Sequence, residues 1–327
     1  MKQKILITRP FFPDLIDRLR GFFEVEVNEG PKYTAAQLRE ALRDKAGAIL
    51  AGGEKIDATV VEGLSGLRIL CVSAAGYNNV DVDALTRAGI MVTNSPGPAD
   101  ETVADFAWGS LIAAARRLTE GEHWVQEGHW TASAGQRFFG TDVFGKTIGI
   151  MGMGGIGRAI ARRAPGFRVK ILYHNRHRHA ASIEEECQAT YASKEALLGE
   201  SDFVILCMPY TPGNHHLIGA EELKRMRSTA ILVNIARGGL IDEPALVEAL
   251  QHGRIGGAAL DVFEGEPAVY PGLIGLRNVV LTPHIAGATW EAQHGLAAMA
   301  ADNLIAALGE GTELRRPPAL LNPEVLK

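Results

Sequence analysis

Short apolar runs alternate with amphipathic segments along the first hundred residues of the chain. KILIT, EVEV, GAILAG, RILCVSA and IMVTN have the length and the β-branched content of strands, whereas PDLIDRLRGFF and TAAQLREAL have helical periodicity. Strands that alternate with helices at this spacing predict a parallel sheet. The stretch from Asn94 to Pro98, NSPGP, interrupts the pattern as a linker would.

The pattern after this linker predicts a second unit of the same kind. A long helix is expected from about Asp100 to Leu118, and an irregular stretch with Trp and Gly follows over 121–145. The alternation then resumes with KTIGIM, VKILYHN, FVILCMPY, AILVNIA, GGAALDVF and NVVLTPH. The final segment, 287–308, is expected to be one helix that returns to the first domain. We therefore predict an α/β protein with two doubly wound parallel-sheet domains, 1–99 with 285–327 and 100–284.

Composition agrees with a two-domain protein and argues against several classes of function. The chain has 327 residues, of which 46% are hydrophobic, so it can bury two cores. Lys plus Arg number 33 and Asp plus Glu 38, a net charge of −5, which argues against binding to nucleic acid or to anionic membranes. No apolar run reaches the roughly 18 residues of a membrane span, and MKQKILITRP is too polar for a secretory signal.

The three cysteines are too few and too scattered for a disulfide framework. We therefore expect a cytoplasmic protein. Cys71 and Cys207 lie in apolar runs and are expected to be small buried residues, and Cys187 has no CxxC partner and receives no role.

The first motif with a chemical meaning is Gly152-x-Gly154-x-x-Gly157. It follows the apolar run TIGIM and opens the amphipathic segment IGRAIARRA. Between a strand and a helix, these glycines permit a tight turn and the close approach of a pyrophosphate to the helix N-terminus. The motif therefore predicts a dinucleotide site.

Polar or small residues also follow four of the later apolar runs. In a parallel sheet the carboxyl ends of the strands share one edge, where ligands bind. Taken singly, such residues are more often structural: a strand-end His is usually a satisfied surface residue, and Arg237 before two glycines is compatible with a turn cap. Together they predict a cleft lined by Cys207-Met208-Pro209, Arg237, Asp261 and His284.

An arginine, a histidine and a carboxylate beside a nicotinamide are the groups that carbonyl reduction requires. Negative charge grows on the carbonyl oxygen as hydride arrives, and that oxygen then needs a proton. A protonated imidazole supplies it, and an adjacent carboxylate such as Glu266 stabilises the charged imidazole. Arg237 would hold the carboxylate of a 2-keto acid through its planar guanidinium.

Four motifs in this order resemble the signatures of the D-2-hydroxyacid dehydrogenase family: GMGGIG, NIARGG, ALDVFEGEP and LTPHIAGAT. The resemblance extends over the whole chain. VSAAGYNNVDVDAL, ETVAD and GTDVFGKTIGI are most similar to the glyoxylate/hydroxypyruvate reductase and 2-ketogluconate reductase branch. The resemblance implies a flavodoxin-like substrate domain, a Rossmann cofactor domain and a hinge between them. It also implies a homodimer in which 121–145 form part of the dimer arm.

The resemblance also implies roles for individual residues. Arg237 would bind the substrate, His284 would act as acid in reduction and base in oxidation, and Glu266 would be its partner. Ala75 and Gly76 would offer backbone amides to the substrate carboxylate, and Asp261 would orient the nicotinamide carboxamide. No metal ligand is expected. The residues expected at the cofactor are Thr102, Gly152, Gly154, Gly155, Ile156, Gly157, His174, Asn175, Arg176, Cys207, Met208, Pro209, Ala236, Asp261 and Gly287.

The basic stretch ILYHNRHRH, 171–179, bears on the choice of coenzyme. Where NAD-using relatives have an Asp for the ribose hydroxyls, this chain has His174, followed by Asn175 and Arg176. We expect Arg176 to bind the 2′-phosphate of NADP, helped by Asn175 and by His174 or His177, with NAD as the weaker alternative.

Two other interpretations of this stretch are open. A solvated basic loop without a specific partner is the stronger alternative. A metal site at His174, His177 and His179 is the weaker one, because a second ligand cluster is missing and hydride transfer needs no metal. The turn at Pro165-Gly166 is shorter than in relatives by about one residue, which leaves the register of 174–176 open by one position.

The sequence thus predicts an NADPH-preferring reductase of glyoxylate, hydroxypyruvate or 2-keto-D-gluconate that forms D-2-hydroxy acids. The loop from Ser73 to Asn79, which carries Tyr77, suits small acids but does not rank them. One alternative is a 3-phosphoglycerate-type dehydrogenase, which is disfavoured because this chain has no room for a C-terminal regulatory domain. Another is a nicotinamide-sensing, corepressor-like protein, disfavoured by the complete Arg, Glu and His set. Trp130 would line the site or the dimer arm, and a packing role is favoured.

Overall fold

The computed structural model describes residues 2–309 and 316–326. The chain divides into two compact units, one formed by residues up to Ala99 and from Thr289 onward, and the other by Asp100–Ala288. Residues 285–288 thus belong to the second unit, whereas the sequence suggested a boundary after His284. The reason is local: the backbone N–H groups of Ile285 and Ala286 donate to the carboxylate of Asp261, at 2.9 and 2.8 Å.

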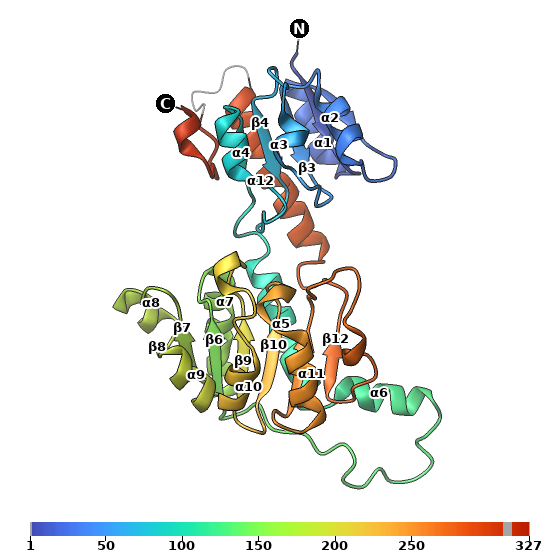
Figure 1. Ribbon diagram of the computed structural model, residues 1–327, viewed down its shortest axis with the longest axis vertical. Helices are drawn as coiled ribbons and strands as arrows, with labels where there is room; N and C mark the ends of the chain where they lie inside the picture. Colours follow the sequence, from blue (N-terminus) through green and yellow to red (C-terminus); the bar gives the residue numbers. More distant parts are fainter. Residues whose placement is uncertain (1, 310–315, 327) are drawn as a thin grey trace. The chain divides into compact units, whose positions relative to one another are not determined.

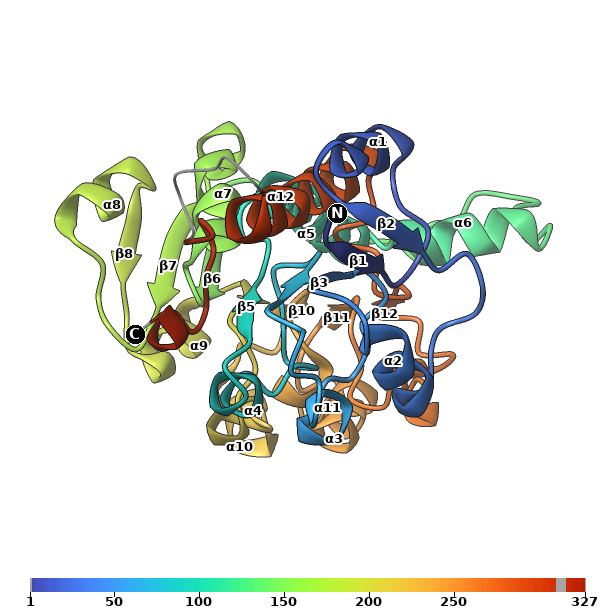
Figure 2. The same cartoon turned by 90° about the horizontal axis from the view of Figure 1, so that it is seen from above.

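The first unit is built on a five-stranded sheet in which every pairing is parallel. Its strand order is β2-β1-β3-β4-β5, the order of flavodoxin-like folds. Figure 1 labels β3 and β4 in the blue part of the chain, and Figure 2 labels β1, β2 and β5. The strands are β1 (Lys4–Ile7), β2 (Glu24–Val27), β3 (Gly47–Leu50), β4 (Ile69–Val72) and β5 (Met91–Thr93).

Helices cover both faces of this sheet, as Figure 2 shows: α1 (Pro13–Phe22) and α12 (Trp290–Leu308) lie on one face, and α2 (Ala35–Leu42), α3 (Ala58–Val61) and α4 (Val82–Arg87) on the other. Side chains alternate between the two cores, with Ile5 and Ile7 facing α12 and Leu6 facing α2 and α3. The last helix begins at Trp290, three residues later than predicted, because the Thr289 side chain caps it by accepting from the Ala292 N–H.

The second unit is built on a seven-stranded parallel sheet of order β12-β11-β10-β9-β6-β7-β8. This is the Rossmann order with a seventh strand, and its direction of winding reverses between β6 and β9. The central strands are buried almost completely and read as apolar runs, whereas the edge strand β8 is partly exposed. They are β6 (Thr147–Met151), β7 (Lys170–His174), β8 (Ala189–Tyr191), β9 (Phe203–Leu206), β10 (Ile231–Asn234), β11 (Gly257–Leu260) and β12 (Val279–Leu281).

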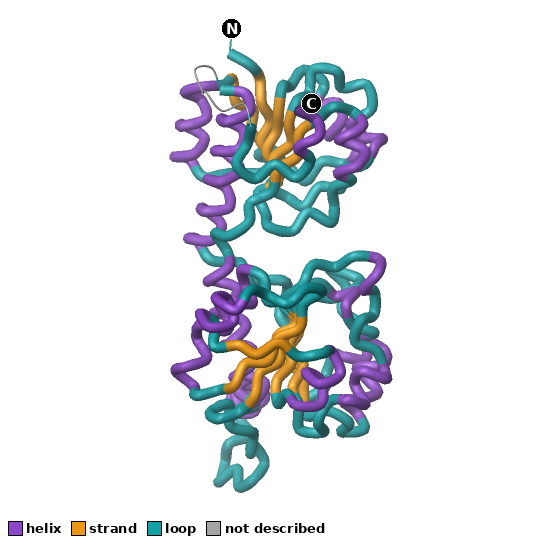
Figure 3. Tube along the Cα trace, turned by 90° about the vertical axis from the view of Figure 1, so that its left-hand side faces the viewer, coloured by secondary structure: helices purple, strands orange, loops and turns teal. Residues whose placement is uncertain are grey.

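Helices again enclose the sheet, and Figure 3 shows the strands of each unit as a central layer between helices. On one face α5 (Asp100–Ala115) packs against α7 (Gly155–Arg163), and on the other α9 (Lys194–Glu200), α10 (Ala220–Arg225) and α11 (Glu243–Gln251) pack in a row. A short α8 (Ala181–Glu186) precedes β8. Single 3₁₀ turns lie at Ala164–Phe167, Pro212–Asn214, Gly238–Leu240, Pro271–Leu273 and Pro323–Leu326.

The helix expected over 100–118 ends at Ala115, and a second helix extends into the stretch 121–145 that was expected to be irregular. Arg117 has φ 53°, in the left-handed region, and so ends the helical path of α5 before α6 (Leu118–Gln126) begins. Its guanidinium holds the break by donating to Glu120 at 2.8 Å and to the Arg137 carbonyl at 2.6 Å. From there to β6 the chain has no helix or strand. Among the described residues, no helix has the length and apolar content that a membrane crossing needs.

Candidate active site

The glycine loop lies between β6 and α7, at the point where the strand order reverses. Gly152 has φ 95° and passes so close to Met208 that a Cβ there would lie 2.6 Å from the Met208 Cβ, so only glycine fits. Gly154 precedes α7 without any side-chain cap. The first N–H groups of α7 therefore lack a side-chain acceptor, and a phosphate is the anion that this arrangement suits.

The end of β7 lies directly beside this loop. His174 pairs with Met151, and its carbonyl accepts from the Gly152 N–H at 3.0 Å. The Asn175 side chain is already engaged: its Oδ1 accepts from the Met153 N–H at 2.7 Å, and its Nδ2 lies 2.9 Å from His179 Nε2. We therefore assign Asn175 to shaping the glycine loop rather than to holding a phosphate.

The three basic residues that follow differ in their partners. Arg178 donates twice to Glu184, each time at 2.8 Å, and this pairing, with a hydrogen bond from Tyr173, lowers the pKa of Glu184 to about 2. Arg176 and His177 are exposed, and among the described residues neither has an acidic partner. Arg176 is thus the guanidinium of this stretch that remains available to an anion.

A cavity of about 530 Å³ joins these elements within the second unit. Eight of the residues expected at the cofactor line it: Gly152, Gly154, His174, Asn175, Arg176, Cys207, Met208 and Pro209. The Cys207 thiol donates to the Gly152 carbonyl at 3.0 Å, and burial raises its pKa to about 12. Cys207 therefore acts as a packing residue at the base of the loop, not as a nucleophile.

Arg237 follows β10 in a turn that Asn234 holds. The buried Asn234 side chain donates to the Arg237 carbonyl at 2.9 Å and accepts from the Ala236 N–H at 3.0 Å. A Cβ at Gly238 would overlap the backbone of Phe263 and Glu264, so glycine is required where these two loops cross. Burial lowers the pKa of the Arg237 guanidinium, and the charge of Glu266 opposes that shift. The group stays cationic near neutral pH.

His284 and Glu266 form a hydrogen-bonded pair in the same unit. Nδ1 of His284 lies 2.8 Å from Oε2 of Glu266, whose Oε1 accepts from the Phe263 N–H at 2.9 Å. Half of the His284 side chain is exposed, and Nδ1 is engaged, so Nε2 is the ring nitrogen available to a substrate. His284 has φ 55°, a left-handed conformation.

Asp261 holds the loop that carries His284. Its buried carboxylate accepts from the Thr282 hydroxyl at 2.7 Å and from the N–H groups of Ile285 and Ala286. Its carbonyl accepts from the His284 N–H at 2.8 Å. The loop is therefore fixed on both sides of the histidine, a role for Asp261 and Thr282 that the motif alone did not indicate.

Comparison with known proteins agrees with this geometry. The family model of the D-isomer specific 2-hydroxyacid dehydrogenase, NAD binding domain, matches residues 108–286. A glyoxylate reductase of Thermococcus gammatolerans is 47% identical over all of this chain and 98% of its own length. The glyoxylate/hydroxypyruvate reductase B of Escherichia coli is 43% identical over 94% of this chain and 95% of its own.

The chain belongs to the D-2-hydroxyacid dehydrogenase family.

A solved structure extends the comparison to the fold. It is an NADPH-dependent glyoxylate/hydroxypyruvate reductase from Sinorhizobium meliloti in complex with NADP and malonate, with a TM-score of 0.86 and 32% identity over 98% of this chain and 97% of that one. The predicted fold class and family are thus confirmed, and this member of the family is an NAD(P)-dependent dehydrogenase.

The other residues expected at the site lie at separate places. Thr102 is in the first turn of α5, and Gly287 lies against Val103 of the same helix. Gly155, Ile156 and Gly157 form the first turn of α7, and Ala236 is buried in the turn before Arg237. Ala75 and Gly76 follow β4 in the first unit, whereas the Arg237 cluster belongs to the second.

The histidines of the basic stretch do not converge on one point. His174 Nδ1 lies 2.9 Å from the Ala192 carbonyl oxygen, and His179 Nε2 lies 2.6 Å from that of Met153. Among the described residues, three potential metal ligands come together at a different place, His215, His216 and Glu264. The structure therefore gives no support to a metal site at 174–179.

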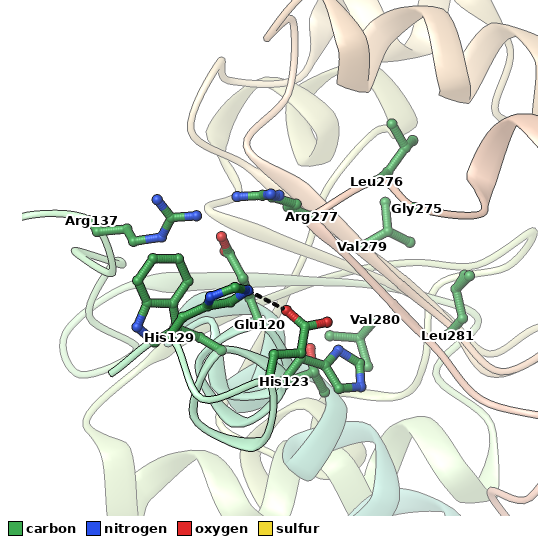
Figure 4. A pocket seen from close by; sticks show the side chains of 13 residues that line it. Glu120, His123, His129, Arg137, Gly275, Leu276, Arg277, Val279, Val280 and Leu281 are labelled. Atoms are coloured by element: carbon green, nitrogen blue, oxygen red, sulfur yellow. Dashed lines mark ion pairs between the residues drawn. The ribbon is translucent and has the colours of Figure 1, made fainter. Parts of the chain in front are cut away.

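A second cavity, of about 540 Å³, lies between α6, the segment that follows it, and β12 (Figure 4). The Arg137 guanidinium lies 3.9 Å from the centre of the Trp124 ring, and His129 pairs with Glu127 at 3.2 Å. The same segment carries exposed aromatic side chains, among them Trp130 and Phe139, which are 66% and 70% exposed. The packing role expected for Trp130 is thus not fulfilled within one chain.

Proposed function

We propose that this dehydrogenase reduces small 2-keto acids, glyoxylate and hydroxypyruvate first among them, to D-2-hydroxy acids with NADPH as the preferred hydride donor. The observation that supports this most directly is the cluster of Arg237, Glu266 and His284 at the carboxyl edge of the Rossmann sheet. The names of the relatives, glyoxylate reductase and glyoxylate/hydroxypyruvate reductase, agree with the reaction.

Each member of the cluster has a distinct task. NADPH, when bound, supplies the hydride. Arg237 holds the substrate carboxylate through its fork of N–H groups and polarises the keto oxygen. His284 gives a proton from Nε2 to that oxygen as negative charge develops on it, and Glu266 stabilises the charged imidazole through Nδ1.

The coenzyme preference rests on Arg176. No acidic residue stands at the end of β7, and Glu184, the nearest acid along the chain, is bound to Arg178. A 2′-phosphate at the mouth of the 530 Å³ cavity would therefore meet the free guanidinium of Arg176 without opposing charge. NAD lacks this phosphate and would gain nothing from Arg176, so we propose it as the weaker coenzyme.

The size of the substrate is inferred from the loop after β4. Ala75 and Gly76 have small side chains, so their backbone amides can reach a carboxylate, and Tyr77 beside them is partly exposed. This favours acids of two or three carbons, with 2-keto-D-gluconate as the third candidate. A 3-phosphoglycerate-type reaction is less favoured, because nothing in this loop favours a substrate that carries a phosphate.

We also propose that two chains pair through residues 121–145. In a single chain this segment exposes Trp130, Phe139 and Phe144 and lines the cavity of Figure 4. Large exposed aromatic side chains gathered on one segment are typical of a protein interface. Light scattering after size-exclusion chromatography should give the mass of two chains, and a double substitution, Trp130→Lys with Phe139→Lys, should give that of one.

The proposed reaction is tested by the oxidation of NADPH and NADH with glyoxylate, hydroxypyruvate and 2-keto-D-gluconate in parallel. We expect turnover with the two small acids, a D-configured product, and a higher kcat/KM with NADPH than with NADH. Tight coenzyme binding without turnover on any of the three acids would favour the sensor alternative and overturn the proposal.

A further inference from the structure

Outside the proposed active site, two adjacent histidines and a glutamate come together from distant parts of the chain. Nε2 of His216 lies 3.0 Å from Oε2 of Glu264, and Nε2 of His215 lies 3.6 Å from Oε1 of the same carboxylate. The two imidazole rings are stacked, with centroids 3.8 Å apart and planes inclined by 24°. Both rings thus direct a nitrogen toward one carboxylate.

The separations match those between ligands of a single metal ion. One ligand atom from each residue, two nitrogens and an oxygen, lies within 4.8 Å of the other two. Around Zn²⁺, with ligand distances of about 2.0–2.1 Å, the edge of a tetrahedron is about 3.3 Å. The two nitrogen–oxygen distances, 3.0 Å to Oε2 and 3.6 Å to Oε1 of Glu264, lie near that value, and rotation of the side chains would bring all three ligand atoms onto one ion.

A backbone hydrogen bond holds His216, and a side-chain contact holds His215. The His216 N–H donates to the Gly239 carbonyl at 2.8 Å, and the Tyr210 ring lies against Gly239. The Tyr210 hydroxyl lies 3.3 Å from Nδ1 of His215, which fixes that ring from its outer side. An oxygen that contacts the distal nitrogen of a ligating histidine is the usual support of a metal site.

The electrostatic surroundings favour a cation. Glu243 is buried 21 residues before Glu264, and its Oε1 accepts from the Glu264 N–H at 2.9 Å. The buried carboxylate of Glu243 thus lies beside the backbone of Glu264, and a dication bound by Glu264 would place positive charge near it.

We propose that His215, His216 and Glu264 bind one divalent transition-metal ion of the Zn²⁺ class, with water completing its coordination. Two imidazoles and a carboxylate suit Zn²⁺ and disfavour Mg²⁺ and Ca²⁺, which prefer oxygen ligands. The site goes beyond the proposed reaction, because hydride transfer to a keto acid needs no metal. A bound ion would join the loop after β9 to the loop after β11, on either side of the turn at Arg237.

The test is a calorimetric titration of metal-free, full-length protein with zinc chloride. We expect one Zn²⁺ per chain in the wild type, and binding that is lost or weakened at least about tenfold in His215→Asn, His216→Asn and Glu264→Gln. Asn at 216 tolerates the left-handed backbone, φ 51°, that His216 adopts. The thermal midpoint of each variant without zinc shows whether it is folded.

The matched control is His294→Asn. His294 also lies 2.8 Å from a carboxylate, that of Asp14, but only two ligands meet there. This control should bind zinc as the wild type does. Zinc-edge X-ray absorption should show two imidazoles at about 2.0–2.1 Å. Equal zinc isotherms for the wild type and all three variants, or no zinc binding to the wild type, would overturn the proposal.

Discussion

Replacing His284 by Gln separates a chemical role for this residue from a structural one. The Gln amide retains polarity and similar length, but it cannot give up a proton as an imidazolium does. In the wild type, Nδ1 of His284 lies 2.8 Å from the Glu266 carboxylate. In the variant, the uncharged Gln amide would donate to that carboxylate instead. His284 is not among the residues that line the 530 Å³ cavity, so coenzyme binding should be retained.

The size of the loss follows from general acid catalysis. A positioned proton donor contributes about 10²- to 10⁴-fold to the rate. Half of the His284 side chain is exposed, so water can reach the same oxygen and replace the lost proton in part. We therefore expect kcat to fall by about 10²- to 10³-fold, which corresponds to about 3–4 kcal/mol of transition-state stabilisation.

The assay is steady-state NADPH oxidation with glyoxylate, combined with a fluorescence titration for the Kd of NADPH. His294→Gln is the control, because it removes another histidine that is paired with a carboxylate at 2.8 Å, in the first unit. The control should keep its full rate. A fall in kcat of less than threefold in His284→Gln, or a parallel rise in the Kd of NADPH, would refute the reasoning.

Three further predictions concern the coenzyme stretch and the cysteines. Arg176→Glu should lower kcat/KM at least about tenfold with NADPH but less than threefold with NADH. Equal losses of kcat/KM with the two coenzymes would contradict the proposed binding of the 2′-phosphate by Arg176. Glu184→Gln should lower the thermal midpoint at pH 7. Because Arg178 lowers the pKa of Glu184 from 4.5 to about 2, the difference in thermal midpoint between wild type and variant should shrink as the pH falls from 4.5 toward 2. Cys71 and Cys187 should resist a thiol reagent at pH 8 until the protein is unfolded, because both are buried and burial raises the pKa of each thiol, to about 12 in Cys71; rapid labelling of more than one thiol in the native protein would be inconsistent with this.

Most of both sheets could be predicted from the sequence because their central strands are buried on both faces and appear as apolar runs, but the short edge strand β8, ATY, was missed. The glycine motif and the strand-end residues Arg237 and His284 were likewise visible, since a parallel sheet brings its carboxyl ends to one edge. The break between α5 and α6 was not visible, because it depends on Arg117 adopting a left-handed conformation that its sequence neighbours do not indicate.

The supporting side chains of the site were also missed. Asn234 and Thr282 act through hydrogen bonds within tight turns, and the only signal was a polar residue at the end of an apolar run, as in AILVN. His216 and Glu264 are 48 residues apart, and only the folded chain brings them together. Asn175 was expected at the coenzyme; it lines the cavity, and its Oδ1 accepts from the glycine loop, a contact that the sequence did not indicate.

The backbone at His284 suggests why activity and stability need not improve together in this enzyme. With φ 55°, the residue occupies a conformation that glycine adopts at no steric cost and that other side chains adopt at some expense. Glycine here would remove the steric cost of this backbone conformation, whereas the proton transfer proposed for His284 requires the imidazole and the four hydrogen bonds around Asp261 that hold it. Under the proposed mechanism, a substitution that stabilises this loop would therefore lower the rate.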